Sequence, residues 1–458
     1  MINMSLEQTR MPMQDPLVRN QNFKETALGY TEQMAIHEAM RCLRCRKHPC
    51  MSNGCPVHNH IPEFIAKITE GDFEAAYQIL TQTTSLPAVC GRVCPQYLQC
   101  EGNCVRGKNG RPVAIGALER FVADWHRTHF PEDNLSERSQ ENANHDKKIA
   151  VIGSGPAGLA CAGDLLDLGY QVTIYEKENV LGGVLAYGIP EFRLPKEILE
   201  REIATLHAKG IETKCGKALG TDFTIEDLMG SYGYDAVFIA NGAGKPVNLG
   251  IPGQNTPGVI TAAELLEKEN LEQKLPTAKQ IVIVGGGNVA MDVCRCAVRI
   301  ASAEKVTIVY RRTRAEMPAD PKELEEALEE GVGIRYLTGP VAVENKDGIV
   351  TGLRCQKMQL SEADASGRKE AVPVADSEFV LPADLIVEAI GSRSDNACAD
   401  GVELSEKKGY ILTDPDTCQT SLQGVFAGGD TVTGPKTVIS AMSAGKKAAK
   451  AIHEYLHS

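Results

Sequence analysis

The sequence lacks a long apolar run, a secretory leader and an excess of positive charge. None of its apolar runs reaches the roughly 18 residues that a membrane-spanning helix needs. The first segment, MINMSLEQTRMPMQDPLVRN, has no apolar core of the kind found in secretory signals, so we expect a cytoplasmic protein. The net charge of −12 argues against nucleic acid or an anionic membrane as a partner, because both bind to positive surfaces.

Cysteine, in contrast, is abundant and unevenly distributed. Thiolates are soft ligands that favour iron or zinc, and a reducing cytoplasm favours metal binding over disulfides. Of the 15 cysteines, eight form two quartets that predict two metal or cluster sites: Cys42, Cys45, Cys50 and Cys55, then Cys90, Cys94, Cys100 and Cys104. The others are predicted to be small buried hydrophobic residues, namely Cys161, Cys215, Cys294, Cys296, Cys355, Cys398 and Cys418.

Basic residues are interleaved with both quartets. Their side chains either form a solvated surface or offset the net negative charge of thiolate-bound clusters and tune their potential. The sequence favours neither interpretation. The residues are Arg41, Arg44, Arg46, Lys47 and His48 in the first quartet, and Arg106, Lys108 and Arg111 after the second.

The pattern along the chain changes once, from helical to alternating. Apolar residues recur at helical intervals in 1–130, and the polar stretch 131–148 is typical of a linker. A strand, a glycine-rich turn, a helix and a strand then occur twice, which predicts two Rossmann-like nucleotide-binding domains. We therefore expect an α/β protein with a helical N-terminal cluster domain and linker at 1–145. The first nucleotide-binding domain should comprise 146–245 and 389–458, and the second 246–388.

The first glycine-rich turn has the full dinucleotide-binding pattern. It reads Gly153-Ser154-Gly155-Pro156-Ala157-Gly158, and Glu176 ends the strand that follows. The glycines permit a tight turn, close approach of backbone amides to a pyrophosphate, and close packing of helix on strand. The carboxylate accepts a hydrogen bond from a ribose 2′-hydroxyl and repels a 2′-phosphate. This site should therefore hold FAD or NAD and not NADP.

The second turn differs where the cofactor is selected. It reads Gly285-Gly286-Gly287-Asn288-Val289-Ala290, with alanine at the third glycine position. The following strand ends in Arg311 and Arg312, where NAD-binding domains have an acid. Guanidinium groups suit a 2′-phosphate through charge-assisted hydrogen bonds, so this site should prefer NADPH.

One site that repels a 2′-phosphate and one that binds it predict an NADPH-dependent flavin enzyme. Flavoproteins of this kind can pass electrons to a Cys-x-x-Cys pair, but Cys294 and Cys296 lie two apart on a predicted helix and face different sides. The cysteine-rich domain is then the electron exit, because iron–sulfur clusters carry electrons and structural zinc does not. No general base is required for this chemistry.

Four further stretches are specific to one family: CGRVCP, QCEGNCVRG, PVAIGALERF and YGIPEFRLPK. Through them the whole chain resembles the small (beta) subunit of NADPH-dependent glutamate synthase and its relatives. Among these relatives are the large subunit of the electron-bifurcating NADH-dependent ferredoxin:NADP oxidoreductase and the N-terminal half of dihydropyrimidine dehydrogenase. The resemblance implies one FAD, an NADPH site, two 4Fe-4S clusters and an electron-accepting partner subunit.

The resemblance also implies two ligand sets in which the spacing quartets exchange members. Cys42, Cys45, Cys50 and Cys104 would hold the first cluster. Cys55, Cys94 and Cys100 would hold the second with Glu119 as the fourth ligand, although Cys90 competes with Glu119 for that place. The chain departs from the family by one residue: four residues separate Cys50 from Cys55 where the family has three.

The remaining cofactor contacts are carried over from the family in the same way. For FAD they are Gly153, Gly155, Pro156, Ala157, Gly158, Glu176, Lys177, Gly182, Gly183, Gly429, Asp430 and Thr437. For NADPH they are Gly285, Gly287, Asn288, Val289, Arg311 and Arg312. Gly242 and Gly391 are expected where the chain crosses between the two domains, as hinges or as ordinary turns.

The leading hypothesis is thus the small subunit of a glutamate synthase, which needs a partner chain because no barrel-length α/β segment remains for glutamate synthesis. Three alternatives stay open. An electron-bifurcating or ferredoxin-linked transhydrogenase subunit shares every motif. A zinc-stabilised interaction module on a nucleotide-sensing body and a disulfide reductase share only some.

Overall fold

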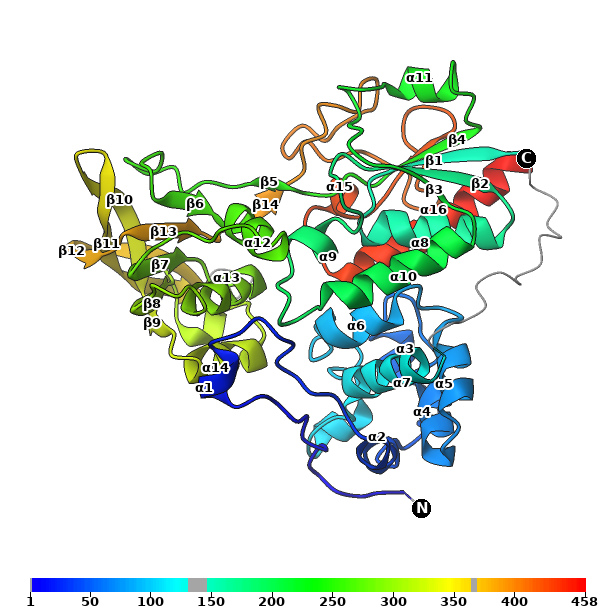
Figure 1. Ribbon diagram of the computed structural model, residues 1–458, viewed down its shortest axis with the longest axis horizontal. Coiled ribbons are helices and arrows are strands. Elements are labelled where there is room, and N and C mark those ends of the chain that lie inside the picture. Colours follow the sequence, from blue (N-terminus) through cyan, green and yellow to red (C-terminus); the bar gives the residue numbers. More distant parts are fainter. Residues whose placement is uncertain (1, 131–145, 364–368) are drawn as a thin grey trace.

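The computed structural model describes residues 2–130, 146–363 and 369–458, and it has three parts (Figure 1). A helical N-terminal part lies below one α/β unit and beside a second. Its helices are α1 (Pro16–Arg19), α2 (Glu32–Ala39), α3 (Pro49–Ser52), α4 (Ile61–Glu70), α5 (Phe73–Leu80), α6 (Pro87–Val93), the 3-10 turn η1 (Val105–Lys108) and α7 (Ile115–His129). Most of the predicted linker lies outside the described residues.

The helical part has its own core. Apolar side chains of α4, α5 and α7 face one another, among them Phe64, Ile68 and Leu118, each fully buried. Gly71 ends α4 in a left-handed conformation (φ +77°), and Asp72 then caps α5 by accepting a hydrogen bond from the Ala75 amide. These caps fix the helix pair that supports the cysteine-rich loops.

The first α/β unit is a parallel five-stranded sheet in the order β15-β4-β1-β2-β3. The strands are β1 (Lys148–Ile152), β2 (Gln171–Tyr175), β3 (Glu212–Lys214), β4 (Ala236–Ile239) and β15 (Val425–Ala427). Its helices are α8 (Pro156–Asp167), α9 (Val184–Tyr187), α10 (Lys196–Ala208), α11 (Ile225–Met229), α15 (Asp430–Thr433) and α16 (Val438–Leu456). The C-terminal segment therefore completes this sheet.

Helices α8 and α16 cross at unusually short range. A Cβ on Gly445 of α16 would lie 2.1 Å from the Ala157 carbonyl oxygen of α8, so only glycine fits. The contact places the middle of α16 against the first turn of α8, next to the glycine-rich turn (Figure 1).

The second α/β unit is another parallel sheet, ordered β6-β13-β7-β8-β9. Two short antiparallel strands, β5 (Lys245–Pro246) and β14 (Ser392–Arg393), join it to the first unit. Its strands are β6 (Val259–Thr261), β7 (Gln280–Val284), β8 (Lys305–Val309), β9 (Gly333–Arg335) and β13 (Leu385–Glu388). Its helices are α12 (Ala262–Asn270), α13 (Asn288–Val298), the 3-10 turn η2 (Arg314–Glu316) and α14 (Pro321–Glu329). The predicted α/β fold with two Rossmann-like units is confirmed.

An antiparallel sheet that the sequence analysis did not predict extends from the second unit. It consists of β10 (Thr338–Lys346), β11 (Ile349–Ala363) and β12 (Lys369–Pro382), in that order. The ends of the predicted domains at 245 and 388 fall at the short strand β5 and at the last residue of β13, and they stay predictions. In the described ranges, no helix has the length and apolar character to cross a membrane.

Buried charges join the three parts. Arg19 of α1 binds Glu330 (2.9 Å) at the end of α14, and Arg295 and Arg299 of α13 bind the same carboxylate at 2.7 Å. Figure 1 shows α1 beside α14, far along the chain from it. Between the two units, Arg193 binds Asp292 (2.8 Å) of α13 and Glu323 (2.6 Å) of α14.

Candidate functional site

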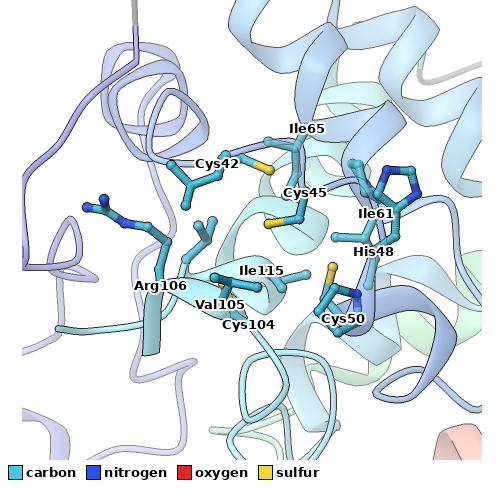
Figure 2. A pocket seen from close by; sticks show the side chains of 14 residues that line it. Cys42, Cys45, His48, Cys50, Ile61, Ile65, Cys104, Val105, Arg106 and Ile115 are labelled. Atoms are coloured by element: carbon cyan, nitrogen blue, oxygen red, sulfur yellow. The ribbon is translucent and has the colours of Figure 1, made fainter. Parts of the chain in front are cut away.

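One pocket of the N-terminal part is lined by four thiols. They belong to Cys42, Cys45, Cys50 and Cys104, and the apolar side chains of Ile61, Ile65, Val113 and Ile115 close its inner wall (Figure 2). Burial, and then the neighbouring thiols of Cys104 and Cys42, raise the pKa of Cys50 to about 12. Because cationic iron stabilises thiolates, four thiols in an apolar pocket fit a 4Fe-4S cluster.

A second group gathers where α6 and α7 meet. Burial raises the pKa of Cys55 to about 11, and its thiol lies close enough to Glu119 and Cys94 for their charges to contribute to this rise. Burial raises the pKa of Cys100 as well, together with charges that include those of Glu119, Cys94 and Cys55. Cys104 lies on the first pocket, although spacing had grouped it with Cys94 and Cys100. Cys55 lies in the second group, although spacing had grouped it with the other cysteines of the first quartet.

The carboxyl group of Glu119 makes no hydrogen bond or ion pair with another described residue. Burial alone raises the pKa of its carboxyl group to about 8. A buried carboxylate without a partner is costly, and a cluster iron would satisfy it. The residues present therefore fit a second cluster with Glu119 as a ligand.

Cys90 lies next to the same group but has partners. Its fully buried thiol contacts Met442 Sδ of α16 at 3.6 Å and hydrogen bonds with Cys94. Cys90 therefore lies where the second group meets the first α/β unit. Within the described ranges, no three potential ligands are gathered as tightly as a single metal ion requires.

The first glycine-rich turn has the shape that a pyrophosphate needs. Gly153 has a φ of +97°, and a Cβ on Gly158 would lie 2.0 Å from the Gly153 carbonyl oxygen. A Cβ on Gly155 would meet no atom within 4 Å, so the space beside the beginning of α8 is open. Pro156 and Ala157 form the first turn of α8 behind it.

Glu176 follows β2 and is held against this turn. Its carboxylate accepts hydrogen bonds from the amides of Ser154 (2.9 Å) and Glu178 (3.0 Å). Ser154 Oγ in turn accepts one from the Gly182 amide (2.9 Å), and a Cβ on Gly183 would lie 2.9 Å from Gly155 Cα. These contacts gather Glu176, Gly182 and Gly183 at one edge, whereas Lys177 points into solvent.

The opposite edge is formed by α15 and the beginning of α16. Burial raises the pKa of Asp430 to about 6, and its carboxylate accepts a hydrogen bond from the Lys436 amide (3.1 Å). A Cβ on Gly429 would lie 2.9 Å from Ala157 Cβ, which places α15 against α8. Thr437 caps α16 by accepting a hydrogen bond from the Ser440 amide. These contacts link the predicted FAD residues to the first turn, except Lys177 and Thr437.

The second glycine-rich turn repeats this geometry. Gly285 has a φ of +152°, and its Cβ would lie 2.2 Å from the Ala389 carbonyl oxygen, whereas a Cβ on Gly287 would be free. Asn288 Oδ1 accepts a hydrogen bond from the Asp320 amide at 2.8 Å, and Val289 is 45% exposed at the open end of α13. The predicted binding face of this unit is therefore accessible.

Arg311 and Arg312 follow β8 beside that face. Arg311 is exposed, and Arg312 Nε is buried with no hydrogen-bond partner in the described residues. A buried guanidinium nitrogen without an acceptor fits a site that completes its hydrogen bonds with a 2′-phosphate. Gly242 and Gly391 have φ values of +71° and +112° and lie beside β5 and β14, where the chain crosses between units.

Among the scattered cysteines, two predictions of burial are wrong. Cys215 is exposed and Cys398 is half-buried, because both lie in loops rather than in a strand or helix. Cys294 and Cys296 are fully buried in α13, as predicted. The sequence analysis missed Met442 and Gln99, which link the cysteine-rich part to α16, and no motif marks either of them.

Comparisons with known families divide the chain at the polar stretch. Residues 19–130 match the family model for dihydropyrimidine dehydrogenase domain II, 4Fe-4S cluster. Residues 147–445 match the model for pyridine nucleotide-disulphide oxidoreductase. These matches agree with the cluster-fitting pockets in the first part and the two nucleotide-binding units in the second.

Whole-chain relatives are also found. The chain is 36% identical to the glutamate synthase [NADPH] small chain of Escherichia coli (strain K12), covering 97% of this chain and 96% of that one. It is 41% identical to the NADP(+)-dependent formate dehydrogenase subunit beta of Moorella thermoacetica over 89% of this chain, but it spans only 60% of that relative. Among solved structures, Mycobacterium tuberculosis FprA in complex with NADPH superposes with a TM-score of 0.60 at 22% identity. The match covers 68% of this chain and 85% of FprA, and it supports the fold alone.

The predictions of an oxidoreductase and of FAD, 4Fe-4S and NADPH as its cofactor types are confirmed by these matches, whereas the number of clusters stays a prediction. The ligand and contact residues stay predictions as well. The chain belongs to the glutamate synthase small-chain family, in which a 4Fe-4S domain precedes a pyridine nucleotide-disulphide oxidoreductase domain.

Proposed function

We propose that the chain is the NADPH-oxidising small subunit of a glutamate synthase, passing electrons through two 4Fe-4S clusters to a larger partner subunit. Flavin, when bound, supplies the change from two-electron hydride chemistry to one-electron transfer, and the clusters carry single electrons. The relatives named above as small and beta subunits support a partner subunit in general. The large glutamate synthase subunit is the specific proposal.

The observation that carries this proposal is the direct packing of the second cysteine group on the FAD-type unit. Gln99 donates a hydrogen bond to Thr437 Oγ1 (3.2 Å), at the cap of α16. Ser443 of α16 donates one to the Pro56 carbonyl oxygen (2.9 Å), next to Cys55. Cys90 contacts Met442 between them. A cluster in this group would lie against the flavin unit, and the first pocket would lie farther out.

The chain's own side chains bind and orient the cofactors in this scheme. Glu176 would accept a hydrogen bond from the FAD ribose, and the beginning of α8 would face the pyrophosphate. Arg311 and Arg312 would bind the NADPH 2′-phosphate. Cys42, Cys45, Cys50 and Cys104 would hold the first cluster, and Cys55, Cys94, Cys100 and Glu119 the second.

The ligand sets are tested by two matched variants of protein purified without oxygen. The unaltered chain should contain about eight iron atoms, because each cluster has four. Glu119→Ala should lose about half of the iron, whereas Cys90→Ser should retain it. If only Cys90→Ser lost iron, Cys90 and not Glu119 would be the fourth ligand of the second cluster. Zinc without iron or labile sulfide would support the interaction-module alternative.

The physiological reaction is tested on the chain with its co-purified partner. Glutamine plus 2-oxoglutarate should sustain NADPH oxidation, and neither should do so alone. NADPH oxidation that requires ferredoxin plus NAD would favour the transhydrogenase alternative. Thiol reductase activity that survives deletion of residues 1–130 would favour a disulfide reductase.

A second candidate follows from the relative with 41% identity, the NADP(+)-dependent formate dehydrogenase subunit beta. In that case the chain would receive electrons from a formate-oxidising partner and reduce NADP⁺. Formate-dependent NADP⁺ reduction by the co-purified complex would support it over the glutamate synthase.

A further inference from the structure

The two segments that form the first cysteine pocket carry positive charge without any acidic residue. The net charge is −12, yet no Asp or Glu occurs between Glu38 and Glu63 or between Glu101 and Glu119. The first segment contributes three of the pocket's four thiols, and the second contributes the fourth, Cys104. These two segments are therefore positively charged although the whole chain is negatively charged.

Two of the cations in these segments have structural roles. Arg41 is fully buried, binds Glu38 at 2.6 Å, and donates to the carbonyl oxygens of Arg111 (2.7 Å) and Pro112 (2.8 Å). Arg106 is buried and donates to the Ser5 carbonyl oxygen. Both connect these segments to one another or to the N-terminal residues, and Arg106 also lines the pocket (Figure 2).

The other five cations remain exposed and make no ion pair with a described residue. We call them the basic rim: Arg44, Arg46, Lys47, Lys108 and Arg111. Arg44, Arg46 and Lys47 lie between the first three cysteines of the pocket, and Lys108 and Arg111 follow Cys104. Unpaired charges of one sign gathered at one site act on an approaching charged protein before contact.

Apolar side chains are exposed beside the basic rim. Met4 is 65% exposed and Leu6 is 58% exposed. The Leu6 carbonyl oxygen accepts a hydrogen bond from the Arg111 amide (2.8 Å), which fixes this segment against the rim. Exposed apolar side chains flanked by unpaired charges are typical of the surfaces that bind another protein.

We propose that the basic rim is the docking surface for an electron-accepting partner protein whose own redox centre is surrounded by carboxylates. This inference rests on the proposed function, because it requires electrons at the first pocket. Each NADPH would give NADP⁺, one proton and two electrons, and the partner's oxidised centre would take the electrons one at a time. Charge complementarity at the pocket would speed the encounter and orient the two centres.

The proposal is tested with two small one-electron acceptors of opposite charge, acidic rubredoxin and basic cytochrome c, reduced by the intact chain with NADPH. For the unaltered protein, kcat/KM for rubredoxin should fall steeply as salt is raised from about 10 mM to 300 mM, because screening shortens the reach of the rim. Arg46→Glu/Lys108→Glu should lower kcat/KM for rubredoxin at low salt at least about tenfold, remove its salt dependence, and raise kcat/KM for cytochrome c.

A matched control separates the rim from the overall charge. Lys346→Glu/Lys357→Glu reverses two exposed, unpaired charges on β10 and β11, far from the pocket along the chain. It should leave both acceptors unaffected within about twofold. Equal effects of the two double variants would overturn the proposal, and so would salt-independent reduction of rubredoxin by the unaltered protein.

Two further readouts keep the outcomes distinct. NADPH-dependent reduction of the iron–sulfur absorbance, without any protein acceptor, tests the proposed function itself, and its loss in the unaltered protein would defeat both proposals together. Iron content and this reduction should be unchanged in the rim variant. If the chain associated with itself at low salt and the rim variant did not, the basic rim would bind a second copy of this chain. That result would overturn the proposal of an electron-accepting partner at the rim.

Discussion

The two nucleotide-binding units share a path of strand, glycine-rich turn, helix and strand, and two of the positions at which they differ bear on cofactor choice. At the third glycine position, the FAD-type unit has Gly158 and the NADPH-type unit has Ala290. After the second strand, the FAD-type unit has Glu176 and the NADPH-type unit has Arg311 and Arg312. The first difference sets how closely helix and strand pack, and the second sets the charge offered to a ribose.

The difference shows that cofactor choice in this chain is a local property placed on a common backbone. Both turns leave their third residue open to a pyrophosphate, since a Cβ on Gly155 or on Gly287 would meet no atom within 4 Å. Only the charge at the strand end has opposite sign. Changing that charge should therefore alter cofactor binding and leave the fold intact.

The contact between the two units should give the largest effect. Arg193→Ala leaves the buried carboxylate of Asp292 and that of Glu323 without their cation, which costs about 3–5 kcal/mol when one partner of a buried pair is removed. Thermal unfolding should reveal it as a much lower midpoint. Arg354→Ala, which removes an exposed pair with Glu344, is the control and should cost under about 1 kcal/mol. A midpoint that falls equally in both variants would refute the interdomain role.

Exchanging the third turn residue should come next in size. Gly158→Ala places a methyl group 2.0 Å from the Gly153 carbonyl oxygen, so α8 must move away from β1, at a cost of about 3 kcal/mol with loss of bound FAD. The reverse change, Ala290→Gly, should cost about 1 kcal/mol through helix propensity alone. Unfolding midpoints and flavin content measure both. Comparable losses in the two variants would contradict the packing difference.

Removing the arginines should separate the two pyridine nucleotides. Arg311→Ser/Arg312→Ser should lower kcat/KM for NADPH about 100-fold, because charge-assisted hydrogen bonds contribute about 1.5–3 kcal/mol each in favourable cases. The kcat/KM for NADH should stay within about twofold. Steady-state kinetics with a small acceptor measures both, and a parallel fall for NADH would mean that the arginines support the fold and not the 2′-phosphate.

The smallest effect is expected for the acid of the FAD-type unit. Glu176→Gln keeps the shape and one hydrogen-bond acceptor but loses the charge that the Ser154 and Glu178 amides face, so FAD should dissociate about tenfold more readily. Equilibrium dialysis of flavin measures this. Glu212→Gln on the neighbouring strand β3 is the control, and a KM for NADPH that shifts in Glu176→Gln would contradict the separation of the two sites.

The nucleotide-binding sites could be predicted from the sequence because each is contiguous. A turn, a helix and the end of the next strand lie within one short segment. The motif residues therefore locate the rest of each site: Gly153 and Glu176 in the first, Gly285 and Arg311 in the second. Both Rossmann-like units could be predicted from this order of strand, turn, helix and strand. The β10–β12 sheet did not, because its strands follow no cofactor motif and alternate only weakly.

The cysteine sites could not be resolved in the same way, because each is closed by residues distant in the sequence. Cys104 returns to the pocket of Cys42, and Cys55 leaves its own quartet to join Cys94 and Glu119. Spacing predicted two sites but neither the grouping of their thiols nor the place of Glu119; only the family resemblance separated the sets. Arg19 was missed for a related reason: its partner Glu330 lies in another domain, and no local pattern predicts a buried pair over that separation.

The central claim is that electrons from NADPH reach iron–sulfur clusters in the N-terminal part by way of the FAD-type unit. Anaerobic rapid freezing of the intact chain after mixing with NADPH, followed by electron paramagnetic resonance, tests it most directly. The account predicts signals of reduced 4Fe-4S clusters that form at least as fast as turnover, and their loss in Gly158→Ala, which we expect to lose FAD. Bleaching of the flavin without any iron–sulfur signal on the turnover timescale would contradict the account.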